Sequence, residues 1–151
     1  MKILKYIGFG LLSIFLFFIG IALINSANQA KPSETFIPFI KQSMPEIAKW
    51  DQGVFERLMT DEAFNSITTE QWQLYLNKVS SLGSLESIGE LSLENTSSVT
   101  SFGGGTRSTA VYTVPLNFTT GLAHAKLVLV HTDELGVKIH HIKFLANRLM
   151  Q

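Results

Sequence analysis

Four histidines carry the side chains most often used for acid–base or metal chemistry near neutral pH. They are His124, His131, His140 and His141, and all lie in segments that predict β-strands. A metal ion needs several side chains that converge on one point. Successive strand residues point to opposite faces, so His140 and His141 diverge, and so do His124 and His131. We therefore expect solvated histidines, with no metal site and no bound cofactor.

Motifs for nucleophilic catalysis or phosphate binding are absent from the sequence. No serine stands in a Gly-x-Ser-x-Gly turn, and no Lys-Ser/Thr pair follows the glycine run at residues 103–105. That run predicts a flexible hairpin connection. The chain has no cysteine, which excludes thiolate chemistry, disulfides and a lipidated anchor. We therefore name no catalytic residue and expect a protein that is not an enzyme, while an acid–base pair such as Asp51 with a sheet histidine stays an open alternative.

Trp72 and Tyr112 are the two residues that could line a binding pocket. Each is large and amphipathic, and each falls on a face that the hydrophobic pattern turns inward. Such side chains either fill a core or border a cavity between a helix and a sheet. The sequence leaves both alternatives open.

The N-terminal segment has the length and composition of a membrane anchor. Ile7 to Ile24 is a run of eighteen residues without a charge, and a helix of that length rises about 27 Å, close to the hydrocarbon thickness of a bilayer. Lys2 and Lys5 precede the run, which places the N-terminus in the cytoplasm. We predict a signal-anchor over residues 1–26 that contacts the lipid bilayer; the alternative is a cleaved signal peptide.

A polar stretch over residues 27–34 predicts a linker, and residues 35–151 predict one extracytoplasmic domain. Thr35 to Met59 has helical spacing, with a break expected at residues 51–53. Ser43 either caps a new helix before Pro45 or lies in a longer helix that Pro45 kinks. Thr68 and Gln71 form the pattern of a capping box that opens another helix, which ends at Gly83.

The second half of the chain predicts strands. Four segments have strand composition or alternation: Glu86 to Glu94, Thr109 to Thr119, Ala123 to His131, and Val137 to Leu145. Pro115 suggests an edge position or a bulge. Helices followed by strands indicate an α+β domain. We expect helices packed on a curved antiparallel sheet of about four strands, after a transmembrane helix.

The segments "TAVYTVPLNF" and "AKLVLVHTDELGVKIHHIKF" after a helical half resemble the cystatin-like, nuclear-transport-factor-2-like superfamily. Trp72 followed by Leu82-Gly83 is similar to exported bacterial members of unknown function. Val137 stands where many relatives carry a tryptophan. The resemblance implies a cone-shaped pocket between helix and sheet, in a fold that hosts unrelated activities.

The charge balance bears on the partner. Twelve Lys and Arg oppose twelve Asp and Glu, and no segment clusters the cations that phosphate binding requires, so we expect no nucleic acid. We predict a single-pass protein of the inner (cytoplasmic) membrane that displays a non-enzymatic binding or assembly module, with a protein partner or a homodimer through the open sheet face. The alternative is a small-ligand-binding or hydrolytic domain that uses the pocket.

Overall fold

The computed structural model describes residues 34–103 and 105–150 of the chain. The predicted anchor over residues 1–26 lies outside the described residues, as does all of the predicted linker except residue 34. Within the described ranges, no helix combines the length and the hydropathy needed to cross a membrane. The unit formed by Thr35–Gln151 is a compact body of its own.

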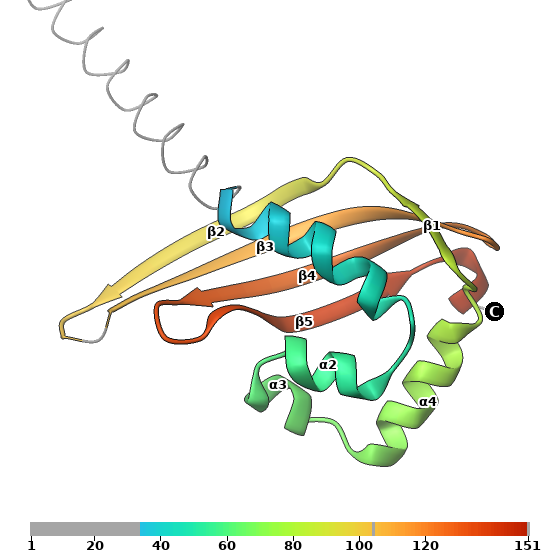
Figure 1. The fold of residues 1–151 in the computed structure, drawn as a ribbon, viewed down its shortest axis with the longest axis horizontal. Helices are drawn as coiled ribbons and strands as arrows, with labels where there is room; N and C mark the ends of the chain where they lie inside the picture. The colour runs from blue at the N-terminus through green and yellow to red at the C-terminus, as the bar shows by residue number, and fades with distance from the viewer. Residues whose placement is uncertain (1–33, 104, 151) are drawn as a thin grey trace, which may run out of the picture. The chain divides into compact units, whose positions relative to one another are not determined.

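This unit is an α+β domain in which helices pack against a curved antiparallel sheet (Figure 1). The helices are, in order, residues 34–47, α2 (Gln52–Leu58), α3 (Asp61–Asn65), α4 (Thr69–Ser80) and the final 3₁₀ turn η1 (Asn147–Met150). The strands are β1 (Leu85–Ile88), β2 (Ser92–Ser101), β3 (Gly105–Phe118), β4 (Gly121–Thr132) and β5 (Gly136–Leu145). β1 and β2 both pair with β3, which pairs with β4, which pairs with β5.

Within the described residues the sheet has five strands, whereas the sequence predicted about four. The segment from residue 86 to residue 94, expected to be one strand, is divided between β1 and the start of β2. β1 and β2 lie along the same side of β3, and residues 89–91 between them make no ladder. The gap lies opposite Pro115, whose carbonyl oxygen accepts from the Gly89 N–H at 2.8 Å. Pro115 has no N–H to donate toward this side, so the neighbouring strand is interrupted there. Of the two alternatives for Pro115, the edge position is wrong, since β3 has partners on both sides; the irregularity lies in the facing strand, where residues 89–91 make no ladder.

The core forms where one stripe of the first helix meets the inner face of the sheet. Phe36, Ile40, Met44 and Ile47 are buried at spacings of three and four. The alternation predicted for β3 is confirmed, because its inward residues are all buried: Ala110, Tyr112, Val114, Leu116 and Phe118. Ser43 is buried inside the continuous helix 34–47, so it does not cap a new helix.

The ends of the helices follow local rules. The predicted capping box is confirmed: Thr68 Oγ1 accepts from the Gln71 N–H at 3.2 Å, and the Gln71 side chain accepts from the Thr68 N–H at 3.0 Å. The predicted break near residue 51 is also confirmed, because Asp51 caps α2 through a 2.8 Å bond from the Gly53 N–H. Gly83 follows α4 with a positive φ of 84°.

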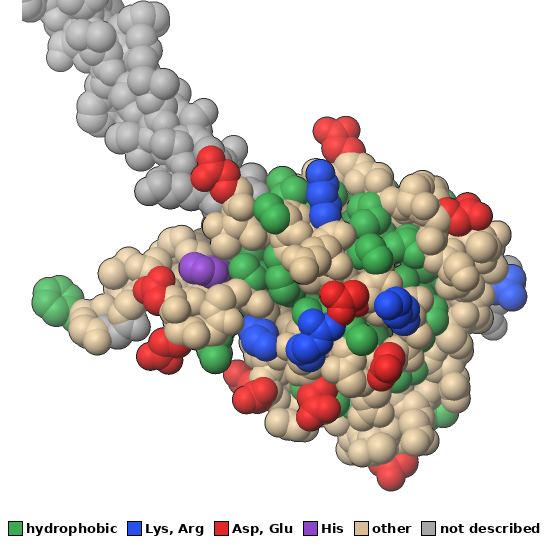
Figure 2. All heavy atoms as spheres, viewed as in Figure 1, with side chains coloured by type: hydrophobic (Ala, Val, Ile, Leu, Met, Phe, Trp, Pro, Cys, Tyr) green, Lys and Arg blue, Asp and Glu red, His purple; other side chains and the backbone are tan. Residues whose placement is uncertain are grey.

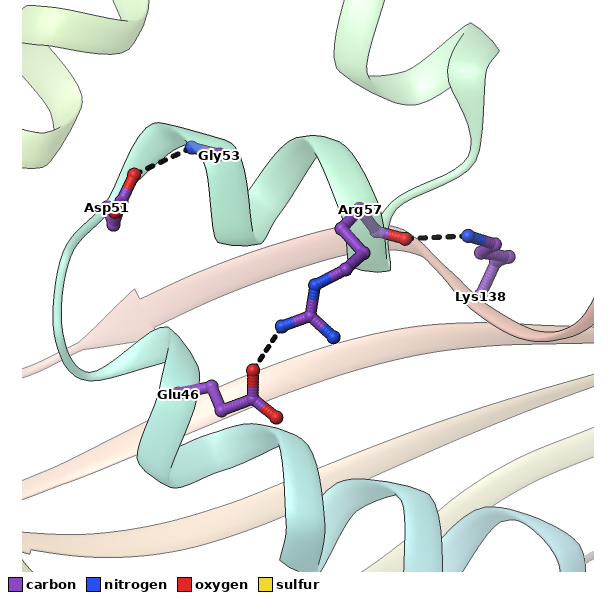
Figure 3. Close-up of polar contacts among 5 residues, drawn as sticks. All are labelled: Glu46, Asp51, Gly53, Arg57 and Lys138. Carbon is purple, nitrogen blue, oxygen red and sulfur yellow. Dashed lines mark hydrogen bonds and ion pairs between the residues drawn. The ribbon is translucent and has the colours of Figure 1, made fainter.

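Polar contacts fasten α2 between the first helix and β5 (Figure 3). Arg57 pairs with Glu46 of the first helix, and the Lys138 ammonium of β5 donates to the Arg57 carbonyl oxygen at 2.6 Å. On the face of the molecule that Figure 2 presents, acidic and basic side chains are interspersed. This face therefore has no extended field of one sign.

Candidate functional site

A groove of about 950 Å³ lies between α3, α4, β5 and η1. Its walls come from residues that are far apart in the chain, which only the tertiary fold brings together. One wall is the segment 140–146, and the opposite wall includes Trp72, Tyr75 and Val79 of α4. Leu149 and Met150 of η1 border it at the C-terminus of the chain. This size falls within the range of about 300–1,000 Å³ that is usual for ligand pockets.

Trp72 borders the groove and is contacted on several sides. Its side chain is 1% exposed, and its indole N–H donates to the Phe64 carbonyl oxygen at 3.2 Å. The ring stacks on Phe64 with centroids 5.2 Å apart and packs against Phe55 at 5.3 Å. The bond to Phe64 satisfies the polar end of the indole, so Trp72 offers the groove an apolar surface.

Tyr75 also borders the groove and carries a hydroxyl in apolar surroundings. It lies one helical turn from Trp72 and meets it edge to face at 5.9 Å. Its hydroxyl is buried and has no hydrogen-bond partner among the described residues. Burial also raises the pKa of Tyr75 above its ordinary value, so the group stays a neutral hydroxyl. A buried hydroxyl without a partner is costly, and a bound molecule could accept its hydrogen bond.

The wall formed by β5 is the edge of the sheet rather than one of its faces. The groove contacts every residue from 140 to 146, whereas side chains on one face would contact it only at alternate positions. β5 is the last strand of the described sheet beyond β4. A bridge between Met59 and Ile139 and the 2.9 Å bond from the Thr60 N–H to the Ile139 carbonyl cover only its beginning.

Ionisable side chains stand at the rim of the groove: Glu62, Lys78, His140, His141 and Lys143. The two lysines against one glutamate give the rim a positive balance when the histidines are neutral. Nδ1 of His140 lies 3.3 Å from the Thr60 hydroxyl. No group of three His, Asp or Glu that could hold a metal ion occurs within the described ranges.

The histidine side chains were expected to diverge, and both residues border the groove. A register shift between β4 and β5 leaves His140 as an extra residue, because Leu129 pairs with Ile139 and Val128 pairs with His141. Such a bulge breaks the strict alternation of side chains. The groove also follows the strand edge, which is adjacent to both faces.

The structure separates the two residues proposed from the sequence for a pocket. Trp72 lines the groove, whereas Tyr112 is buried at the centre of β3, with its ring 6.4 Å from that of Phe36. The Tyr112 hydroxyl, like that of Tyr75, is buried without a partner in the described part of the chain. Nothing in the spacing of Tyr75 along the sequence marked its hydroxyl as unpaired.

A second hollow of about 990 Å³ lies between the end of the first helix and β1, and Trp50, Lys41, Lys49 and Glu86 border it. The Trp50 indole N–H already donates to the Gly83 carbonyl oxygen, at 3.4 Å. Neither buried unpartnered side chain of the described residues borders this hollow. The groove beside β5 is therefore the stronger candidate for a binding site.

No protein-family model matches the chain, and no match was found among curated proteins or solved structures. What the protein does must therefore be argued from the groove itself.

Proposed function

We propose that the protein is a non-enzymatic binding module, held at the outer surface of the inner (cytoplasmic) membrane by its N-terminal segment, and that it binds its partner in the groove beside β5. The uncharged run from Ile7 to Ile24 supports the anchor. The helix across a curved antiparallel sheet supports a cystatin-like domain.

The observation that carries this proposal is an apolar groove with one buried, unpartnered hydroxyl. Trp72, Val79, Phe144 and Leu149 border the groove although each is at least nine-tenths buried, so its floor is continuous with the core. The Tyr75 hydroxyl lies in this apolar setting. Binding sites combine these features, because apolar walls supply affinity and a few placed polar groups fix orientation.

Hydrolysis in this groove is the alternative, and it would need an acid and a base that act together. Glu62 and His140 both border the groove. No hydrogen bond joins them, and the ring nitrogen Nδ1 of His140 faces the Thr60 hydroxyl instead. The geometry therefore favours binding over general acid–base catalysis.

The two tryptophans of the chain allow a direct test. Trp72 borders the groove and Trp50 borders the second hollow. The full-length chain, labelled with 5-fluorotryptophan and reconstituted in lipid nanodiscs, should give two fluorine resonances, which Trp50→Phe assigns. The probes are small apolar fragments and pools of random ten-residue peptides. We expect them to shift the Trp72 resonance in a saturable way and to leave the Trp50 resonance unchanged. Shifts of Trp50 alone, or no shift with any probe, would contradict the proposal.

A matched pair of variants checks the location. Leu145 borders the groove and is 45% exposed, whereas Leu122 of β4 is 58% exposed and lies outside it. Leu145→Asp should weaken binding of the probe that shifts Trp72, because it adds a desolvated charge to an apolar site. Leu122→Asp should leave binding unchanged. Equal effects of the two substitutions would argue against the groove.

A further inference from the structure

We propose that the natural occupant of the groove is an extended peptide segment that pairs with the edge of β5 and carries apolar side chains at alternate positions together with a net negative charge. This inference rests on the proposed binding function and names the class of partner. It follows from three features of the site: the edge of the strand, the contact that already begins the pairing, and the chemistry of the groove walls.

The first feature is an edge strand that forms a groove wall. In an antiparallel strand, every second residue directs its N–H and C=O away from the neighbouring strand. β5 pairs with β4 on one side, and beyond residue 139 no other described segment pairs with its second side. The groove runs along residues 140–146 of this side. A partner that fills the groove therefore meets a row of backbone donors and acceptors, which an extended peptide satisfies best.

The second feature is the contact at the start of the strand. Met59 forms a parallel bridge with Ile139, and the Thr60 N–H donates to the Ile139 carbonyl oxygen. The chain itself thus occupies the edge at Ile139 and then turns away into α3. A peptide laid along residues 141–145 continues this pairing where the intramolecular segment leaves it. At about 3.3 Å per residue, five or six peptide residues span that length.

The third feature is the chemistry of the walls. Alternate side chains of the added strand point toward an apolar surface formed by Trp72, Val79 and Phe144. The Tyr75 hydroxyl, buried and without a partner among the described residues, becomes a donor to a carbonyl or carboxylate of the peptide when the bound segment reaches it. Lys78 and Lys143 outnumber the single rim carboxylate, which favours an acidic partner over a basic one. A small amphipathic molecule is the alternative occupant: it would contact the same apolar surface without pairing with the edge of β5.

The decisive experiment separates backbone pairing from simple filling of the groove. Peptides are first selected from a random display library by their binding to the full-length chain in nanodiscs. Only those that shift the fluorine resonance of Trp72 are kept. One selected peptide is then N-methylated at each amide in turn. We expect affinity to fall about tenfold or more at alternate amides and to stay nearly unchanged at those between, because only every second N–H faces β5.

Two tyrosines supply a matched control for the hydroxyl contact. Tyr75→Phe should weaken the selected peptide several-fold, whereas Tyr112→Phe should leave its affinity unchanged, since Tyr112 lies in the core away from the groove. Both variants lose a buried hydroxyl that has no partner among the described residues, so both should remain folded. Thermal unfolding of each variant verifies this.

Different failures have different meanings. A uniform effect of N-methylation along the peptide would overturn strand pairing. Small apolar fragments that shift Trp72 while no selected peptide does so would also overturn it, yet groove binding would stand. No shift of Trp72 with any probe would overturn both this inference and the proposed function. Selected peptides that are consistently basic would contradict the charge argument.

Discussion

The backbone N–H of Thr60 donates a hydrogen bond of 2.9 Å to the carbonyl oxygen of Ile139. This bond joins the junction of α2 and α3 to the edge of β5. The hydroxyl of the same threonine accepts from the Ala63 N–H at 3.2 Å, as the N-cap of α3, and lies 3.3 Å from Nδ1 of His140. Thr60 therefore fixes one end of the groove wall through both its backbone and its side chain.

Replacing Thr60 by alanine should lower the free energy of unfolding by about 1–2 kcal/mol, because the cap of α3 and the contact with His140 are both lost. Thr60→Ser keeps the hydroxyl, so its free energy of unfolding should fall much less. Urea unfolding of both variants measures the difference. Equal losses would mean that the methyl group, and not the hydroxyl, stabilises this junction.

Removing either unpartnered tyrosine hydroxyl should leave stability unchanged or raise it by up to about 1 kcal/mol. A buried hydroxyl without a hydrogen-bond partner keeps its desolvation penalty, and Tyr75→Phe and Tyr112→Phe both remove it. Denaturant midpoints should therefore not fall for either variant. A marked loss of stability in Tyr112→Phe would show that its hydroxyl has a partner, such as a buried water.

Stability should fall in alkaline solution partly because of Tyr75. Its folded-state pKa is raised by burial above the ordinary value of 10.0, whereas the unfolded chain ionises near that value. The folded and unfolded states bind the same proton below about pH 10, and above it the unfolded state releases the proton first, so the free energy of unfolding declines as pH rises. The free energy of unfolding of Tyr75→Phe should decline less steeply with pH. Urea unfolding between about pH 8 and pH 11 would measure this difference. Parallel curves for the two proteins would contradict the prediction.

Two glycines with positive φ should differ in how badly they tolerate alanine. Gly83 has φ 84°, and an added Cβ would lie 2.1 Å from Oγ1 of Thr119, which itself accepts from the Ser84 N–H. Gly136 has φ 67°, and no described residue other than its chain neighbours has an atom within 4 Å of the added Cβ. Gly136→Ala should destabilise by about 1 kcal/mol through backbone strain alone, and Gly83→Ala by about 2 kcal/mol or more. Similar midpoints in denaturant for the two variants would show that Thr119 moves without penalty.

Features that depend on neighbours in the chain could be predicted closely. The capping box of Thr68 and Gln71 depends on residues three apart, and the alternation of β3 depends on residues two apart. The α+β order followed from the switch between these two periods. For Pro115 the sequence left an edge position and a bulge open, because whether it lies at an edge depends on which strands pair with β3.

The candidate site was predictable only in part. Trp72 was identified from its helix face and does border the groove, and Tyr112 was identified by the same criterion and lies in the core. Burial alone does not distinguish these outcomes. Tyr75, His140 and Leu149 became visible as groove residues only in the assembled fold. The bulge at His140 shifted side chains that strict alternation had placed elsewhere.

The sequence by itself determined which segments are apolar along one face, where the capped helices begin and where the chain turns, because these depend on contacts within a few residues. The tertiary structure alone decided that β5 is the edge strand, that Thr60 reaches a residue 80 positions away at His140, and that a groove remains beside that edge. Such relationships arise from the packing of distant elements, and the spacing of residues along the chain carries no record of them.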